Sequence, residues 1–459
     1  MNDLIARLRT RLGAAHVLTG EDAAPWARDW TGDYAGAPLA VVRPADRDEV
    51  AAVLWLAADF QVPVVPVAGN TGLNGGAIAP GAIALSVARL NRIREIRPES
   101  RLAVVGAGVI VEALDQAAAE HGLCFPLFFG AAGSAMIGGV LSTNAGGSNV
   151  LRYGTTRALC LGLEAVLPDG RILDLMTGLN KDNTGFDLRD LMIGAEGQLG
   201  IITAAVMRLH PRPVERATAM VALDGLAQAP ALLTALQDAS GNEVAAFEYM
   251  PRAYIEHARA LFPQMREPFE APAPVNLLVE VQARRIGQAG AALEEVLGQW
   301  LEAGRIADAV IAQSEAQRRE MWALREASAE IVFCRHPVID TDIALPLDLV
   351  EAFLTRIEPL IQQVDPGCES LAVAHLGDGN IHFNVWLTRE DAALAEALRE
   401  TIDRLVVGMG GTFSAEHGIG IAKRQSMARF KDPVALDLMR SIKQLLDPAG
   451  LLNPGKTLP

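Results

Sequence analysis

The sequence predicts an α+β fold with more than one domain, and three observations support this prediction. The chain has 459 residues, enough for two or three domains at about 150 residues each. Residues 37–210 alternate short β-rich runs with helical periodicity, whereas residues 211–406 order strands and helices in a βαβ-like way. Residues 410–459 combine a glycine-rich turn with one helix. We therefore expect three parts, residues 1–212, 213–409 and 410–459, because prolines interrupt the pattern near residue 212.

The β-rich runs define the expected strands. In the first part they are PLAVVRP (38–44), VPVVPV (62–67), AIALSVA (82–88), LAVVGAG (102–108), GLEAVLP (162–168) and GIITAAVMRL (200–209). The second part adds ATAMVAL (217–223) and VNLLVEVQA (275–283). Apolar residues at helical spacing predict helices at Glu49–Phe60, Val111–His121, Gln288–Leu301 and Pro433–Leu446.

The composition argues against several classes of protein. The chain has 40 Lys and Arg residues against 55 Asp and Glu residues, and its net charge of −15 repels nucleic acid and anionic membranes. The cysteines at positions 124, 160, 334 and 368 are too widely spaced for a disulfide framework or a cysteine-based metal site. The first residues lack the apolar core of a signal peptide, and no run of about 20 apolar residues occurs. We expect a cytoplasmic protein with no transmembrane segment and no nucleic-acid partner.

Two glycine-rich segments in the first part predict a nucleotide-type cofactor. They are PVAGNTGLNGG (66–76) and FFGAAGSAMIGGVLSTNAGG (128–147). Glycine at this density lets the backbone approach a ligand and direct successive N–H groups at a diphosphate. Tight turns are the alternative for either loop alone.

Two familiar phosphate-binding motifs are rejected. Gly106-Ala-Gly108 follows a strand, but Val111 replaces the glycine or alanine that a dinucleotide-binding fingerprint needs for close helix packing. Residues 450–457, GLLNPGKT, match the P-loop pattern, but the two residues that follow provide no helix N-terminus.

Residues 371–386, LAVAHLGDGNIHFNVW, predict a β-hairpin that carries two histidines. Asp378-Gly379 is a preferred two-residue type I′ turn, which would place His375 directly opposite His382. Directly paired residues have Cβ atoms about 4.5–5.5 Å apart on one sheet face, so two imidazoles can bind one metal ion there. Asn384 continues this face. An ordinary packed or surface histidine pair is the alternative.

Glu416-His417 lies among glycines in GGTFSAEHGIG (410–420). Two histidines and one glutamate with open positions form a ligand set for a divalent ion, such as zinc, that must also bind substrate. His417 is not needed as a ligand and is placed to act as a general base. A solvated turn is the alternative for this pair.

Eight segments in the same order resemble the FAD-dependent D-2-hydroxyacid dehydrogenases, whose flavin domain is of the vanillyl-alcohol-oxidase (p-cresol methylhydroxylase, PCMH) type. The segments are residues 64–76, 125–147, 151–154, 161–170, 193–203, 374–385, 414–420 and 445–459. Residues 181–194 and the terminal LNPGKTLP are most similar to the D-2-hydroxyglutarate dehydrogenase branch, with D-lactate dehydrogenases next. The resemblance implies a PCMH-type FAD-binding domain in residues 1–212, an α+β substrate (cap) domain with the metal hairpin in residues 213–409, and a C-terminal helical segment that packs on the FAD domain.

The resemblance implies a non-covalently bound FAD, since the first glycine loop has no His or Cys to tether the ring. The residues expected to bind FAD are Pro66, Ala68, Gly69, Asn70, Thr71, Gly72, Leu73, Gly133, Ser134, Gly138, Gly139, Asn144, Gly147 and Ile201.

The resemblance further implies that His375, His382 and Glu416 bind a divalent metal, with zinc as the expected ion. His417 would remove the hydroxyl proton of a D-2-hydroxyacid while the Cα hydrogen leaves as hydride to flavin N5. Arg325, in MWALREASAE, would bind the substrate carboxylate together with Asn384.

Two positions depart from the hydroxyglutarate branch. That branch usually has a hydroxyl residue four positions after the arginine, where this chain has Ala329, and a lysine where this chain has Asp340. A dicarboxylate substrate favours a base there rather than an acid. D-2-hydroxyglutarate is the expected substrate, and D-lactate or another D-2-hydroxyacid is the alternative.

Three interpretations of function stay open: the dehydrogenase, an oxidase of the same fold, and a non-catalytic flavin subunit of an electron-transfer complex. The expected partners are the small hydroxyacid and an electron acceptor, either an electron-transfer flavoprotein or a quinone. The sequence is also compatible with a homodimer.

Overall fold

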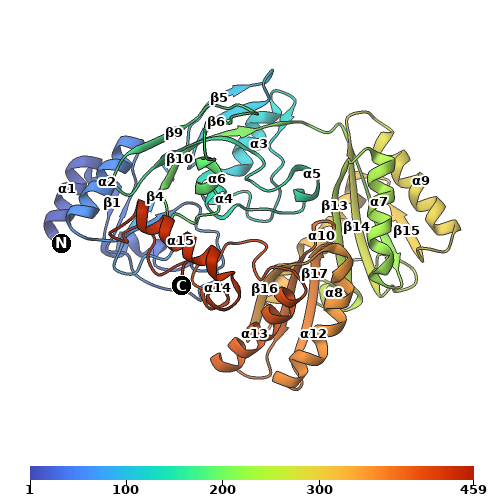
Figure 1. The fold of residues 1–459 in the computed structure, drawn as a ribbon. Helices are drawn as coiled ribbons and strands as arrows, with labels where there is room; N and C mark the ends of the chain where they lie inside the picture. Colours follow the sequence, from blue (N-terminus) through green and yellow to red (C-terminus); the bar gives the residue numbers. More distant parts are fainter. The chain divides into compact units, whose positions relative to one another are not determined.

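The computed structural model describes residues 1–459, which form two compact units (Figure 1). The first unit comprises residues 1–146, 154–212 and 416–459, and the second comprises residues 147–153 and 213–415. None of the helices combines the length and apolar character needed to cross a bilayer.

The first unit is built on two sheets. In the smaller sheet the strands follow the order β1-β2-β4-β3, and β2 and β3 both run parallel to β4. The larger sheet is antiparallel, in the order β5-β6-β10-β8-β9. The strands are β1 Val17–Leu18, β2 Ala40–Val42, β3 Val64–Val67, β4 Ile83–Ser86, β5 Ile93–Arg97, β6 Leu102–Gly106, β8 Cys160–Val166, β9 Ile172–Leu175 and β10 Ile201–Arg208, with β7 Leu123–Cys124 and β11 His210–Pro211 as a separate pair.

The three helices that the sequence predicts in the first unit, at residues 49–60, 111–121 and 433–446, are present to within two residues as α2, α3 and α15. Asp46 caps α2 by accepting a hydrogen bond from the Glu49 N–H, which is the expected N-cap chemistry. The C-terminal segment joins the smaller sheet, because Val64 of β3 forms a β-bridge with Leu452. The helices are α1 Asn2–Leu12, α2 Arg47–Asp59, α3 Val111–Ala119, α4 Ile137–Thr143, α6 Leu188–Met192, α14 Arg424–Phe430 and α15 Pro433–Leu446.

The second unit is organised around one antiparallel sheet of seven strands, in the order β15-β12-β14-β13-β17-β18-β16. The strands are β12 Glu215–Leu223, β13 Val244–Pro251, β14 Val275–Ala283, β15 Asp308–Ile311, β16 Val338–Ala344, β17 Glu369–His375 and β18 Asn380–Trp386. The helices are α5 Val150–Tyr153, α7 Ala229–Ser240, α8 Arg252–Leu261, α9 Gln288–Glu302, α10 Glu315–Glu326, α11 Ser328–Val332, α12 Val350–Val364 and α13 Ala392–Gly408.

The two faces of this sheet differ in composition because side chains alternate along each strand. Ile381, Phe383 and Val385 of β18 lie in the large apolar core that α7, α9, α12 and α13 complete. His382 and Asn384 of the same strand lie on the opposite face, where α8 and α10 pack on other strands. The second face carries a smaller apolar cluster beneath α8 and α10. The sheet therefore buries apolar side chains on both faces, and only this second face, the polar face, also carries the polar side chains His382 and Asn384.

The predicted register of the β17–β18 hairpin is wrong. Residues 376–378 form a short 3₁₀ turn, and Gly379 follows it in the left-handed conformation with φ 78°. The loop is thus longer than the expected two residues, so His375 pairs with Asn380 and His382 pairs with Val373. The two histidines are diagonal neighbours, and the offset of two residues keeps them on one face.

The aromatic pair Phe353–Phe383 gives a direct test of this core. Both rings are fully buried, with centroids 5.7 Å apart in an edge-to-face arrangement. We expect Phe353→Ala to lower the free energy of unfolding by about 3–5 kcal/mol, because it leaves a cavity. Urea or thermal unfolding measures the loss. The exposed Phe186→Ala is the matched control, expected within about 0.5 kcal/mol of wild type; equal stability of both variants would contradict the assigned packing.

Candidate functional site

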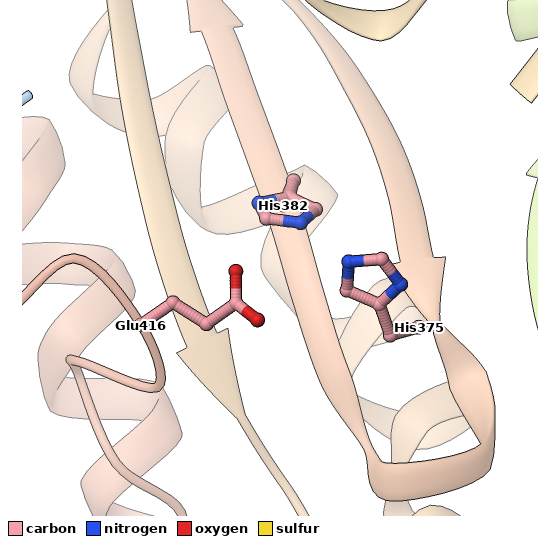
Figure 2. A group of neighbouring side chains, drawn as sticks. All are labelled: His375, His382 and Glu416. Atoms are coloured by element: carbon pink, nitrogen blue, oxygen red, sulfur yellow. The ribbon is translucent and has the colours of Figure 1, made fainter. Parts of the chain in front are cut away.

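His375 and His382 approach each other at the turn end of the β17–β18 hairpin. Their ring centroids are 5.3 Å apart, and the ring planes cross at 78°. Figure 2 shows the two imidazoles on neighbouring strands, with ring nitrogens directed into the space between them. The structure therefore brings the predicted histidine pair together, although in a different register from the expected one.

Glu416 completes the group from a loop. The preceding residue, Ala415, donates its N–H to the Asp342 carbonyl of β16 at 3.0 Å, and β16 is the neighbour of β18. The ligand atoms of His375, His382 and Glu416 all lie within 4.8 Å of one another, and their side chains converge in Figure 2. Two imidazoles and one carboxylate are a donor set that suits zinc or a similar divalent ion and leaves positions for a substrate.

Glu248 of β13 supports this group and was not found from the sequence. Its Oε2 accepts hydrogen bonds from His375 Nδ1 at 2.7 Å and Arg325 Nε at 2.8 Å. Burial alone raises the pKa of the Glu248 carboxyl, but His375 and Arg325 outweigh burial and hold the pKa below its ordinary value. The bond to Nδ1 leaves Nε2 of His375 for a metal, the usual carboxylate–histidine–metal arrangement. A single acid inside the apolar strand 244–251 was the available signal.

Arg325, the predicted substrate arginine, lies beside a proposed metal ligand. It comes from the last turn of α10, it is buried, and its Nη2 lies 3.5 Å from His375 Nδ1. The hydroxyl of the buried Tyr254 lies within hydrogen-bonding distance of the Leu324 and Arg325 carbonyls, at 2.9 and 3.0 Å, which fixes this end of the helix. Glu248 thus places a guanidinium and an imidazole next to each other on the polar face.

Asn384 is the clearest sign that this face receives a ligand. The side chain is only 1% exposed, and neither its amide nitrogen nor its amide oxygen has a hydrogen-bond partner. Buried polar atoms without partners are costly, and a bound group that bonds to them removes that cost. Asn384 pairs with Asp340 on β16 and with Leu371 on β17, so these three side chains share the face.

The two predicted glycine loops lie side by side in the first unit. A Cβ on Gly69 would lie 2.3 Å from the Ser134 carbonyl oxygen, and one on Gly139 would lie 3.0 Å from the Ala68 Cβ. No side chain fits at the first position, so the loops pack backbone against backbone. Asn70 and Asn144 both adopt the left-handed conformation, with φ of 52° and 50°. This bare, turned backbone fits the cradle that a diphosphate needs.

The remaining residues expected at the cofactor site are spread over neighbouring elements of the first unit, with one exception. Gly147, with φ 139°, lies in the segment 147–153 that belongs to the second unit. The others are Pro66 in β3; Thr71, Gly72 and Leu73 in the loop after β3; Gly133 in the turn before α4; Gly138 in α4; and Ile201 at the start of β10.

The rejected fingerprint glycines have a packing role. A Cβ on Gly106 would lie 2.0 Å from the Leu90 carbonyl oxygen, and one on Gly108 would lie 2.2 Å from that of Val87. Close backbone contact therefore accounts for both glycines.

His417, the predicted base, adopts a rare backbone conformation. Its φ is 62°, and its Nε2 lies 3.9 Å from the Glu416 carboxylate. The imidazole is about one-third exposed, so it can exchange protons.

Comparison with known proteins extends these observations to the whole chain. Residues 38–176 match the FAD binding domain family, and residues 212–457 match the family of FAD linked oxidases, C-terminal domain. The chain is 36% identical to the mitochondrial D-2-hydroxyglutarate dehydrogenase of Bos taurus, over 100% of this chain and 84% of that protein. It is also 36% identical to the D-2-hydroxyglutarate dehydrogenase of Xanthomonas citri, over 94% and 91%. Among solved structures, p-cresol methylhydroxylase with substrate bound superposes with a TM-score of 0.75 at 17% identity, over 99% and 96%.

These matches define an FAD-dependent oxidoreductase whose α+β fold is of the vanillyl-alcohol-oxidase (p-cresol methylhydroxylase) type, as the sequence predicts. The chain belongs to the family of FAD-dependent D-2-hydroxyacid dehydrogenases.

Removal of the Glu248 charge tests whether this carboxylate holds the proposed metal ligand His375 in place. Glu248→Gln keeps the shape but removes the anion that orients His375, so we expect zinc affinity to fall about 10–100-fold. Competition with a fluorescent zinc chelator measures the affinity. Glu280→Gln is the matched control, because Glu280 is a buried carboxylate of the neighbouring strand β14 that bonds to Thr218 and Trp322 instead of a histidine. Unchanged affinity in Glu248→Gln would refute the supporting role.

Proposed function

We propose that the chain oxidises a D-2-hydroxyacid to the 2-oxoacid, with non-covalent FAD and a divalent metal, zinc as first choice. D-2-hydroxyglutarate is the first candidate substrate, because the relatives described above carry that activity in their names. The observation that carries the proposal is the convergence of the His375, His382 and Glu416 ligand atoms within 4.8 Å, with His417 adjacent in sequence. An FAD-binding fold alone would account for the flavin but not for this donor set.

The bound groups supply two kinds of chemistry: FAD accepts a hydride, and a divalent cation polarises a hydroxyl group and lowers its pKa. The chain supplies the rest. His417 accepts the hydroxyl proton. The electron pair of the broken O–H bond then forms the carbonyl, while the Cα hydrogen leaves the substrate with its own bonding pair, as hydride. Arg325 offers a planar guanidinium to the substrate carboxylate, and the amide of Asn384 can donate and accept hydrogen bonds. Glu248 holds Arg325 and His375 in place for these contacts.

The electrons must leave the reduced protein again for a second turnover. An electron-transfer flavoprotein or a quinone is the proposed acceptor, and we assign the reaction to the cytoplasm from the composition and cysteine usage. Neither assignment affects the chemistry at the polar face.

One observation favours a second candidate, a D-2-hydroxyacid without a second carboxylate, such as D-lactate. Asp340 of β16 is the cross-strand partner of Asn384. The Asp340 carboxylate therefore lies on the same sheet face as the Asn384 amide, which is proposed to bind the substrate. Ala329, in α11, offers no hydroxyl group to a second carboxylate. Two carboxylates within a few ångströms repel each other by several kcal/mol when water is excluded, so a distal anion on the substrate is disfavoured there.

Anaerobic flavin reduction tests the activity itself. We expect the yellow holoenzyme to bleach with a D-2-hydroxyacid but not with its L-enantiomer, and His417→Ala to slow bleaching by about 10²–10⁴-fold through loss of the base. Chelation of the metal should abolish bleaching while FAD stays bound. Stopped-flow absorbance at the flavin band measures each rate. Bleaching in His417→Ala within about twofold of wild type, a change under ~0.5 kcal/mol in the barrier, would refute the role of His417 as the base. A wild-type protein that no D-2-hydroxyacid bleaches would instead be a non-catalytic flavin subunit.

A charge reversal at Asp340 separates the two candidate substrates. If Asp340 faces the distal end of the substrate, Asp340→Lys should raise kcat/KM for D-2-hydroxyglutarate relative to D-lactate by about tenfold or more. Asp348→Lys makes the same charge change at an exposed site and should leave the ratio unchanged. An unchanged ratio in Asp340→Lys would show that Asp340 does not select the substrate.

A further inference from the structure

The loop that carries His417 has a strained backbone. His417, Gly418 and Gly420 all have positive φ, at 62°, 73° and 53°. A non-glycine residue in this region costs about 1–3 kcal/mol and persists only where its surroundings fix it. Contacts of residues 417–421 with the rest of the unit must therefore fix the backbone conformation of this loop.

One set of contacts comes from the buried carboxylate of Glu196. Its Oε1 accepts a hydrogen bond from the Ile419 N–H and its Oε2 accepts one from the Gly420 N–H, both at 2.8 Å. A Cβ on Gly418 would lie 2.8 Å from the Glu196 Cδ, so the carboxylate fits only against a glycine. Glu196 thus satisfies two successive backbone donors with one group.

A second set of contacts comes from Asn74, the last non-glycine residue of the first glycine loop. Its Nδ2 donates to the His417 carbonyl at 3.2 Å and to the Gly418 carbonyl at 2.8 Å. Its own carbonyl accepts the Ile421 N–H at 2.7 Å. A Cβ on Gly420 would lie 2.1 Å from that carbonyl oxygen, so the two backbones touch. Together with Glu196, Asn74 pairs the backbone polar groups on both sides of the His417–Gly418 turn.

Glu196 is itself held rigidly. Its N–H donates to the Ser142 carbonyl after the α4 glycines at 2.8 Å, and its carbonyl accepts the Asn453 Nδ2 at 2.7 Å. Its own φ is 49°, which is also left-handed. Glu196 therefore links two parts of the first unit: its carboxylate bonds to the loop of residues 417–421, and its backbone N–H bonds to α4. Two of the residues expected to bind FAD lie in α4.

We propose that Glu196 is a positioning residue for the His417 base, with Asn74 as its partner. Glu196 holds the 417–420 backbone in its left-handed turn, and this turn fixes where the His417 imidazole and the Glu416 carboxylate are presented. The inference rests on the proposed function of His417. A carboxylate that only stabilises the fold would change stability without selectively changing the reaction.

The test uses the full-length holoenzyme with Glu196→Ala, Glu196→Gln and Asn74→Ala. For Glu196→Ala we expect flavin reduction by the D-2-hydroxyacid to slow by about 10²-fold, the cost of a misplaced catalytic group, with substrate KM within about threefold of wild type and FAD content unchanged. The Gln variant should recover part of the rate, because its amide oxygen still accepts one N–H. Asn74→Ala should slow reduction in the same direction.

Hydrogen exchange of the 417–421 amides gives a readout independent of activity. The exchange rate should increase in both alanine variants. In Glu196→Ala the Ile419 and Gly420 amides lose their acceptor, and in Asn74→Ala the loop carbonyls lose their side-chain donor. Glu164→Gln is the control, since Glu164 is a buried carboxylate of the same unit that bonds to Arg47 and Thr203 instead of this loop. The control should keep both the wild-type rate and the wild-type exchange at 417–421.

The possible outcomes separate the two proposals. Flavin reduction within about twofold of wild type in Glu196→Gln and Glu196→Ala, or unchanged exchange at 417–421, overturns the positioning role. If Glu196→Ala does not fold, Glu196→Gln and Asn74→Ala decide it by the same two measurements. If the wild type is not reduced by any D-2-hydroxyacid, the proposed function fails, and increased exchange in the variants still shows that Glu196 anchors the loop.

Discussion

The pairing of the buried Glu248 carboxylate with His375 and Arg325 is the interaction on which the polar face of the second unit depends. A charged carboxylate deep in a protein costs several kcal/mol unless charged or hydrogen-bonding groups compensate it. Here the compensation comes from His375 and Arg325, which both bond to the same oxygen. One buried anion therefore places a candidate metal ligand and a candidate substrate arginine side by side, and the pair in turn keeps the anion charged.

The seven-stranded sheet can carry these polar side chains because successive residues of each strand lie on opposite faces. Alternate residues of β18 pack into the large apolar core on one side, where Phe383 contacts Phe353. The residues between them, His382 and Asn384, lie on the other face and do not have to fill that core. A one-residue slip would exchange the two faces and bury the histidine in hydrocarbon, so the apolar core fixes the register of the chemistry.

Much of this arrangement could be predicted from the sequence because it depends on local patterns. The β-rich runs at residues 217–223 and 275–283 predicted β12 and β14, and helical periodicity predicted α9 and α15. The grouping of His375, His382 and Glu416 was also predicted, because an offset of two residues preserves the sheet face. The hairpin register was not, since the Asp378-Gly379 pair favours a two-residue turn in isolation, whereas the chain forms a 3₁₀ turn before Gly379.

The residues that sequence reasoning missed act across long separations. Glu248 is 127 positions from His375, and Glu196 is 223 positions from Ile419, so no spacing rule relates either pair. Each is an acid beside apolar or glycine residues, a signal with many structural explanations. The unpartnered amide of Asn384 likewise appears only when burial and hydrogen bonds are known.

The central claim is that one metal ion binds to side chains of the β17–β18 hairpin and to the carboxylate that follows Ala415. X-ray absorption spectroscopy of the zinc-loaded protein tests it most directly, because it reports the atoms around the ion. The account predicts a shell of nitrogen and oxygen at about 2.0–2.2 Å, with imidazole scattering from two histidines that falls to one in His382→Ala. Sulfur ligands at about 2.3 Å, or a spectrum that His382→Ala leaves unchanged, would contradict it.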